Sequence, residues 1–149
     1  MAQTYIGSTL RTGSGTLTDS TDGGYVVVSQ TTTVTTAAAG TATSATLTIP
    51  ASAQIISFFV DTVQLQVIGA GTATTMPITI GTAAAGTQYV SATDAIAGGR
   101  IALAVTAAQL TAMSDVGTNQ SVFITADPNG TIVTTQAIYR LTVVYAQKV

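Results

Sequence analysis

The feature that most constrains the fold is the alternation of apolar and hydroxyl side chains in short runs rich in β-branched residues. In one run, Ala45, Leu47 and Ile49 alternate with Thr46 and Thr48. A period of two places successive side chains on opposite faces of a strand, so this run predicts a strand with one buried face. Turn residues separate such runs at short intervals, which is typical of an antiparallel sandwich or barrel.

Runs of this kind extend over most of the chain from residue 25 onward. We expect strands over 25–36, 45–49, 55–67, 77–80, 88–92, 99–105, 121–126, 132–135 and 137–146. In the last strand the side chains expected on one face are Tyr139, Leu141, Val143 and Tyr145. Those expected on its other face are Ile138, Arg140, Thr142 and Val144. The predicted fold is all-β: a single antiparallel β-sandwich, jelly-roll-like, with an extended N-terminal arm and one short helix.

Three finer features follow from local patterns. The strand expected over 55–67 begins with a run that is apolar on both faces, which favours a central position in a sheet. Asp127-Pro128-Asn129-Gly130 predicts a hairpin turn into the strand over 132–135. The short helix is expected from Thr106 to Met113, because Thr106 and Gln109 match a capping box and Leu110 and Met113 fall on one helical face.

The chain divides by composition into an arm, residues 1–24, and a β-sandwich domain, residues 25–149. The arm is rich in Gly, Ser and Thr and carries few apolar residues. The remaining length suits one compact domain, which can bury a sizeable core without a disulfide or metal.

The residue inventory excludes most catalytic chemistry. The chain has no His, Cys or Glu, so neither a histidine-based triad nor a thiolate nucleophile is available. We therefore expect no enzyme activity, no metal and no organic cofactor. Asp19 and Asp22 could offer oxygens to calcium, but a calcium site needs about six to eight of them, which favours a solvated turn instead.

The small number of charged residues also limits which classes of partner the protein can bind. The chain has only four basic residues, Lys and Arg together, and six acidic residues, all of them Asp. Nucleic-acid binding needs clustered basic residues, so we expect none. A low net charge favours association with other protein surfaces. The first residues lack the basic and apolar segments of a signal peptide, and no run reaches the ~18 apolar residues of a membrane span, so we expect synthesis in a cytoplasm and no membrane partner.

Two groups of residues are candidate contacts with a shell or another subunit. Arg100 and Arg140 are charges in otherwise neutral strands, where they could pair with an Asp across a subunit contact or extend into solvent as surface arginines. The second group lies in the arm, which could add to an exposed sheet edge or be only a frayed terminus. Its candidates are Tyr5, Ile6, Leu10, Arg11 and Leu17.

Three segments of the chain resemble the small β-sandwich virion proteins of tailed bacteriophages, of the head decoration or cement type. They are Leu47 to Ile56, Ile78 to Val90, and the closing Tyr139 to Tyr145. The resemblance implies a homo-oligomer, often a trimer, that binds the major capsid protein on the outer face of an icosahedral shell and is made in the host cytoplasm. It transfers no catalytic residue.

Two other functions remain open at this point. The chain could be another virion component, such as a head-tail connector, tail or fibre protein. It could also be a Thr-rich ice-binding or adhesive protein, because Thr31 to Thr36 is similar to a flat threonine array. The lack of a fixed repeat counts against the second alternative.

Overall fold

The computed structural model describes residues 11–12, 15–16, 25–114, 117–132 and 134–148. The short elements are β1 (Arg11–Thr12), β2 (Gly15–Thr16) and the helix α1 (Ala107–Ala112). The remaining elements are β3 (Tyr25–Thr35), β4 (Thr43–Ile49), β5 (Ala53–Gln64), β6 (Pro77–Gly81), β7 (Val90–Asp94), β8 (Gln120–Ala126) and β9 (Ile138–Lys148).

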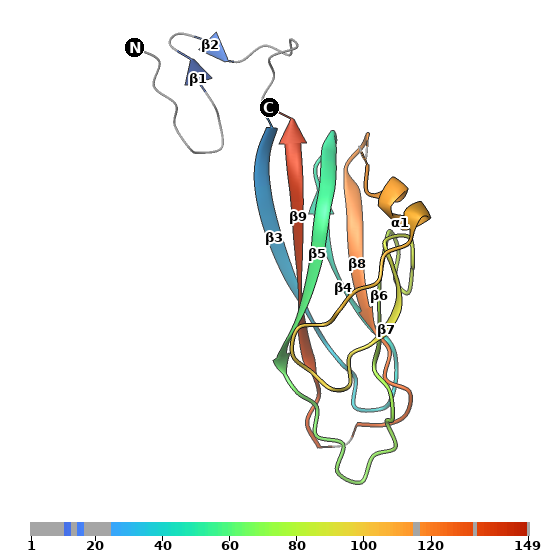
Figure 1. Ribbon diagram of the computed structural model, residues 1–149. Helices are drawn as coiled ribbons and strands as arrows, with labels where there is room; N and C mark the ends of the chain where they lie inside the picture. Colours follow the sequence, from blue (N-terminus) through green and yellow to red (C-terminus); the bar gives the residue numbers. More distant parts are fainter. Residues whose placement is uncertain (1–10, 13–14, 17–24, 115–116, 133, 149) are drawn as a thin grey trace.

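The larger strands form two antiparallel sheets that pack face to face (Figure 1). The first sheet has the order β3-β9-β5 and the second the order β4-β8-β6-β7. Along the chain the strands pass repeatedly from one sheet to the other, which is the connectivity of a jelly roll. The predicted all-β, jelly-roll-like sandwich is therefore confirmed.

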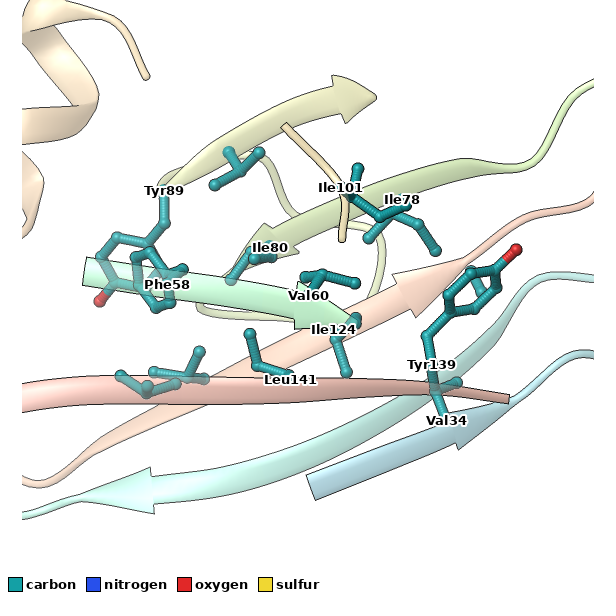
Figure 2. Packing of buried hydrophobic residues seen from close by; sticks show 14 of the residues in the cluster. Val34, Phe58, Val60, Ile78, Ile80, Tyr89, Ile101, Ile124, Tyr139 and Leu141 are labelled. Carbon is teal, nitrogen blue, oxygen red and sulfur yellow. The ribbon is translucent and has the colours of Figure 1, made fainter. Parts of the chain in front are cut away.

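The core lies between the two sheets and is built from the inward side chains of both (Figure 2). Ile78, Ile80 and Ile124 come from the second sheet and Val60 and Leu141 from the first, and all five are fully buried. Phe58 and Tyr89 meet across the interior with their ring centroids 5.3 Å apart. Interlocked β-branched and aromatic side chains of this kind supply most of the stabilisation of a sandwich.

The predicted inner face of the last strand is confirmed. Tyr139, Leu141, Val143 and Tyr145 of β9 are all buried. The Tyr139 hydroxyl is buried too and donates a hydrogen bond to the Ala95 carbonyl at 3.2 Å. Burial, with a smaller contribution from the charge of Asp94, raises the pKa of Tyr139 to about 12, so this phenol stays protonated as a donor.

The strand predicted over 99–105 is wrong in extent. This segment makes only a short bridge to the edge of β5, centred on Asp61 and Arg100. The Thr62 amide donates to Gly99 and the Ile101 amide to Val60, each at 2.9 Å. Pairing then stops, although Leu103 and Val105 still pack on the core.

The hairpin predicted at residues 127–130 is also wrong. After β8 the chain does not turn back but continues beside residues 72–77: the Asp127 amide donates to Pro77 and the Asn129 amide to Thr75, both at 3.0 Å. The strand expected over 132–135 is absent from its described residues, where Thr135 makes an isolated bridge to Val67. A partner distant in sequence thus overrides the local turn signal.

The central position predicted for the strand over 55–67 is wrong as well. In the structure this strand is β5, which ends at Gln64 and forms an edge of the first sheet, and β9 is central. Its inner side chains Ile55, Phe58 and Val60 are buried, whereas Phe59 of the outer face is 37% exposed. Among the described residues, no further layer covers the apolar outer side chains of β5.

The predicted helix is confirmed, with one correction. Thr106 and Gln109 form the expected capping box. The side-chain Nε2 of Gln109 also donates to the Thr87 carbonyl and the Ser91 hydroxyl, both at 3.0 Å. Gln109 and Met113 are the buried side chains, while Leu110, which we expected beside Met113, is 58% exposed.

Candidate interaction surface

The exposed large apolar side chains of the described residues come from a few segments of the chain. None of them lies in β4, β6, β7 or β8. Those more than a third exposed are Tyr25, Val27, Ile56, Phe59, Val63, Leu65, Val67 and Leu110, which belong to β3, to β5 and the residues after it, and to α1. Two of them, Val27 and Phe59, lie on the outer side of the first sheet, and contiguous exposed apolar surface is typical of interaction sites.

Strand register identifies the residues that share this side of the first sheet. Rows run across it from β3 through β9 to β5, for example Thr31, Thr142 and Phe59. We call this surface the open face. It consists of Val27, Ser29, Thr31, Thr33 and Thr35 of β3, Ile138, Arg140, Thr142, Val144 and Ala146 of β9, and Gln54, Ser57, Phe59, Asp61 and Gln64 of β5, and no residue of it is buried.

A small ion cluster lies within the open face. Asp61 accepts two hydrogen bonds from Arg100, at 2.8 Å from Nε and 3.1 Å from Nη2, and Nη2 of Arg140 lies 3.8 Å from its second oxygen. The guanidinium of Arg100 also stacks over the Phe59 ring at 5.1 Å. The hydrogen bonds from Arg100 are the main cause that lowers the pKa of Asp61, so this carboxylate is ionised at neutral pH.

The cluster brings together two of the candidate contact residues. Arg100 and Arg140 are far apart in sequence, and both meet Asp61 of their own chain. Pairing within the chain therefore accounts for their position, without a subunit contact. Two arginines beside one aspartate leave one positive charge on the open face. The Arg140 side chain is half exposed and retains N–H groups for a further acceptor.

An open hollow lies at one end of the open face. It has a volume of about 510 Å³. Its walls are Tyr25, Gln54, Ile55, Ile56, Leu110, Met113, Ser114 and Ala146, contributed by β3, β5, β9 and the end of α1. The Ile55 amide donates to the Met113 carbonyl at 2.9 Å and so attaches the helix to β5 at this point.

The remaining sequence candidates lie in the arm. Arg11 belongs to β1, where it pairs with Thr16 of β2. The others, Tyr5, Ile6, Leu10 and Leu17, lie outside the described residues, as do Asp19 and Asp22. Sequence reasoning missed the apolar part of the open face. The only signal for it in the sequence is the run of β5 that is apolar on both faces, which by itself predicts a central strand.

Among the described residues, no three His, Cys, Asp or Glu side chains lie close enough to hold a metal ion. None of the helices in this part of the chain is long and apolar enough to cross a membrane.

Comparison with known proteins gives one informative match. No protein-family model matches the chain, and no curated protein matches it in sequence. Among solved structures, a chain of the cyanophage Pam1 capsid asymmetric unit is similar, with a TM-score of 0.54 and 17% identity. The match covers 90% of this chain and 94% of that chain. It shows that the two chains share a fold over nearly their whole lengths.

Proposed function

We propose that this protein is a structural component of a phage virion, and specifically a decoration protein that binds the outside of the capsid shell. The observation that carries the proposal is the match to a chain of a phage capsid asymmetric unit, because it extends over nearly all of both chains. A shared fold alone is compatible with many functions, so the chemistry of the exposed surface must also fit a binding role.

The open face supplies that support. It presents apolar and hydroxyl side chains with a single excess positive charge, and the described part of the chain leaves it uncovered. Such a surface suits a protein partner better than nucleic acid, which requires many basic contacts. We propose that the open face lies against the major capsid protein, with the positive charge of Arg140 meeting an acceptor there.

In this proposal the protein works by binding, without catalysis or a cofactor. It would be made in the host cytoplasm and assemble on the capsid exterior. Binding of several copies, each contacting more than one shell subunit, would stabilise the shell through effective concentration without strong charges. An absence of His, Cys and Glu is compatible with this role.

The test is to mix the purified chain with heads that lack it and to count the bound copies by quantitative mass spectrometry. Hundreds of copies per particle are expected for a decoration protein. About five to a dozen copies would indicate a connector, tail or fibre component instead. No binding to heads, at any ratio of protein to particle, would contradict the proposal.

The arm, residues 1–24, belongs to the same proposal as a second contact with the shell. Deleting residues 1–15 should leave the melting temperature nearly unchanged, because the core residues that the structure describes all lie from Val28 onward. The deletion should abolish binding to heads. If the shortened chain binds as well as the full one, the arm has no part in attachment and the open face must suffice.

A further inference from the structure

The two edges of the first sheet differ in how they are protected. Strand β5 has two register shifts, and its edge makes backbone hydrogen bonds to the Met113 and Gly99 carbonyls and accepts one from the Ile101 amide. The β3 edge has none of these features. All eleven residues of β3 pair with β9 in one unbroken register, and no described strand lies on the other side of β3.

Edge strands normally carry a charge, a proline, a bulge or a covering segment, because their free N–H and C=O groups otherwise pair with another chain. β3 contains no charged residue and no proline. It also holds Tyr25 and Val27, which at 60% and 63% are the two most exposed large apolar side chains of the described residues. A long edge of this kind indicates that a further strand covers it in the assembled protein.

The hydrogen bonds show which groups of β3 point to the free edge. The Thr36 amide donates to Ala137, so backbone groups of even-numbered residues point toward β9. The Thr35 carbonyl points the other way and accepts from the Thr43 hydroxyl at 2.8 Å. The free edge therefore consists of the backbone groups of odd-numbered residues from Tyr25 to Thr33, and its midpoint is Ser29.

We propose that this edge pairs with the same edge of a second copy, antiparallel across a two-fold axis at Ser29. In that register Ser29 faces Ser29 of the partner copy, Val27 faces Thr31 and Tyr25 faces Thr33. Each row joins hydroxyl, β-branched or aromatic side chains, which form favourable cross-strand pairs. The five paired rows would exchange about ten backbone hydrogen bonds.

Charge is compatible with this arrangement. Arg140 lies beside Thr33 on β9, so the register would separate the two copies of Arg140 by roughly 30 Å, from strand spacings of about 4.8 Å and rises of about 3.4 Å per residue. This distance exceeds the Debye length of about 8 Å at physiological salt, so the two positive clusters do not repel.

The area of the open face is a further reason to expect the dimer, and this reason rests on the proposed function. The flat outline of the open face of one copy is roughly 500 Å², from three strands of eleven residues. Two copies joined through β3 form one six-stranded sheet whose flat outline is roughly 1,000 Å². The dimer therefore offers a shell about twice the contact area of one copy.

The test measures the mass of the full-length chain in solution by sedimentation, in a concentration series and without any shell. The wild type should pass from monomer to dimer. Ser29→Lys should weaken the dimer at least about fivefold, because like charges meet at the axis. Ser29→Asp should do the same. Mixing the two variants should restore a mixed dimer, which only contact between Ser29 and Ser29 of the partner copy explains.

Thr46→Lys, an exposed position of β4 in the second sheet, is the matched control and should leave the dimer unchanged.

Ser29→Pro provides a second test without charge. It removes an N–H that points away from β9, so the fold should survive, while the loss of two bonds at the axis should weaken the dimer by about 5- to 150-fold. A wild type that remains monomeric, or forms trimers, overturns the proposal. So does a dimer that Ser29 substitutions leave intact. A monomer that dimerises only after residues 1–24 are deleted would show that the arm occupies the edge instead. Failure of head binding with an intact dimer would count against the proposed function alone.

Discussion

The two sheets have similar inner faces and different outer faces. Both bury an alternating row of apolar side chains in the core. On the second sheet, residues 82–88 fold back over the outer face: the Ala85 amide donates to the Thr125 hydroxyl at 2.8 Å, and that hydroxyl also pairs with Ser44 at 2.8 Å. On the first sheet, no residue of the open face is buried, although the Arg100 guanidinium stacks over Phe59.

A glycine shows how closely the loop lies on the second sheet. A Cβ added to Gly81 would stand 2.4 Å from the backbone of Gly86, so only glycine permits this approach. Thr125 beneath the loop is consequently only 3% exposed. The described chain thus satisfies the outer face of the second sheet by itself, and we propose that a partner covers the outer face of the first.

The largest expected effect separates the inner from the outer side of one strand. Leu141 and Thr142 are neighbours on β9, but Leu141 is fully buried and Thr142 belongs to the open face. Leu141→Ala should lower the free energy of unfolding by about 2–5 kcal/mol. Thr142→Ala should change it by about 0.5 kcal/mol or less. Urea denaturation measures both, and similar losses would show that the open face is packed in the isolated chain.

A smaller loss of stability is expected when one hydroxyl is removed from the outer face of the second sheet. Thr125→Val keeps the shape of the side chain but leaves the Ala85 amide and the Ser44 hydroxyl without their partner. We expect a loss of about 1–3 kcal/mol in the free energy of unfolding. Thr31→Val, on the open face, is the matched control and should have almost no effect. Equal losses of unfolding free energy in the two variants would contradict the idea that the described chain covers the outer face of the second sheet only.

The smallest effect concerns the charges of the open face. Because Arg100 lowers the pKa of Asp61 below its ordinary 3.8, the ionised carboxylate stabilises the folded state above that pH, and this stabilisation is lost as the pH falls through the lowered pKa. The melting temperature of Asp61→Asn should therefore fall slightly below that of the wild type near neutral pH and converge with it at acid pH. If the gap between the two melting temperatures grew on acidification, the ionised Asp61 would not stabilise the folded state.

The sequence predicted the features that depend on local periodicity. The inner face of β9 and the capping box of Thr106 and Gln109 are both set by residues close together in the chain. Long-range pairing was not predictable. The bridge between Asp61 and Arg100 joins residues 39 apart, and the segment after β8 follows residues 72–77 because its free backbone groups find partners there.

The edge position of β5 illustrates a further limit. A run that is apolar on both faces fits a strand covered on both sides by its own chain, and it fits equally well a strand covered on one side by another molecule. Periodicity cannot separate these two cases. The sheet order does, because it places β5 at an edge with Phe59 exposed.

The most direct test of the account places the same charge on each outer face and measures binding to heads that lack the protein. Thr142→Lys lies on the central strand of the first sheet, and Ser121→Lys lies on the corresponding strand of the second. Both variants should keep the melting temperature of the wild type, because neither position is buried. Thr142→Lys should bind heads at least about tenfold more weakly, since it buries an unpaired charge in the contact. Ser121→Lys should bind as the wild type does. Equal binding by the two variants, or a defect confined to Ser121→Lys, would contradict the assignment of the open face as the contact surface.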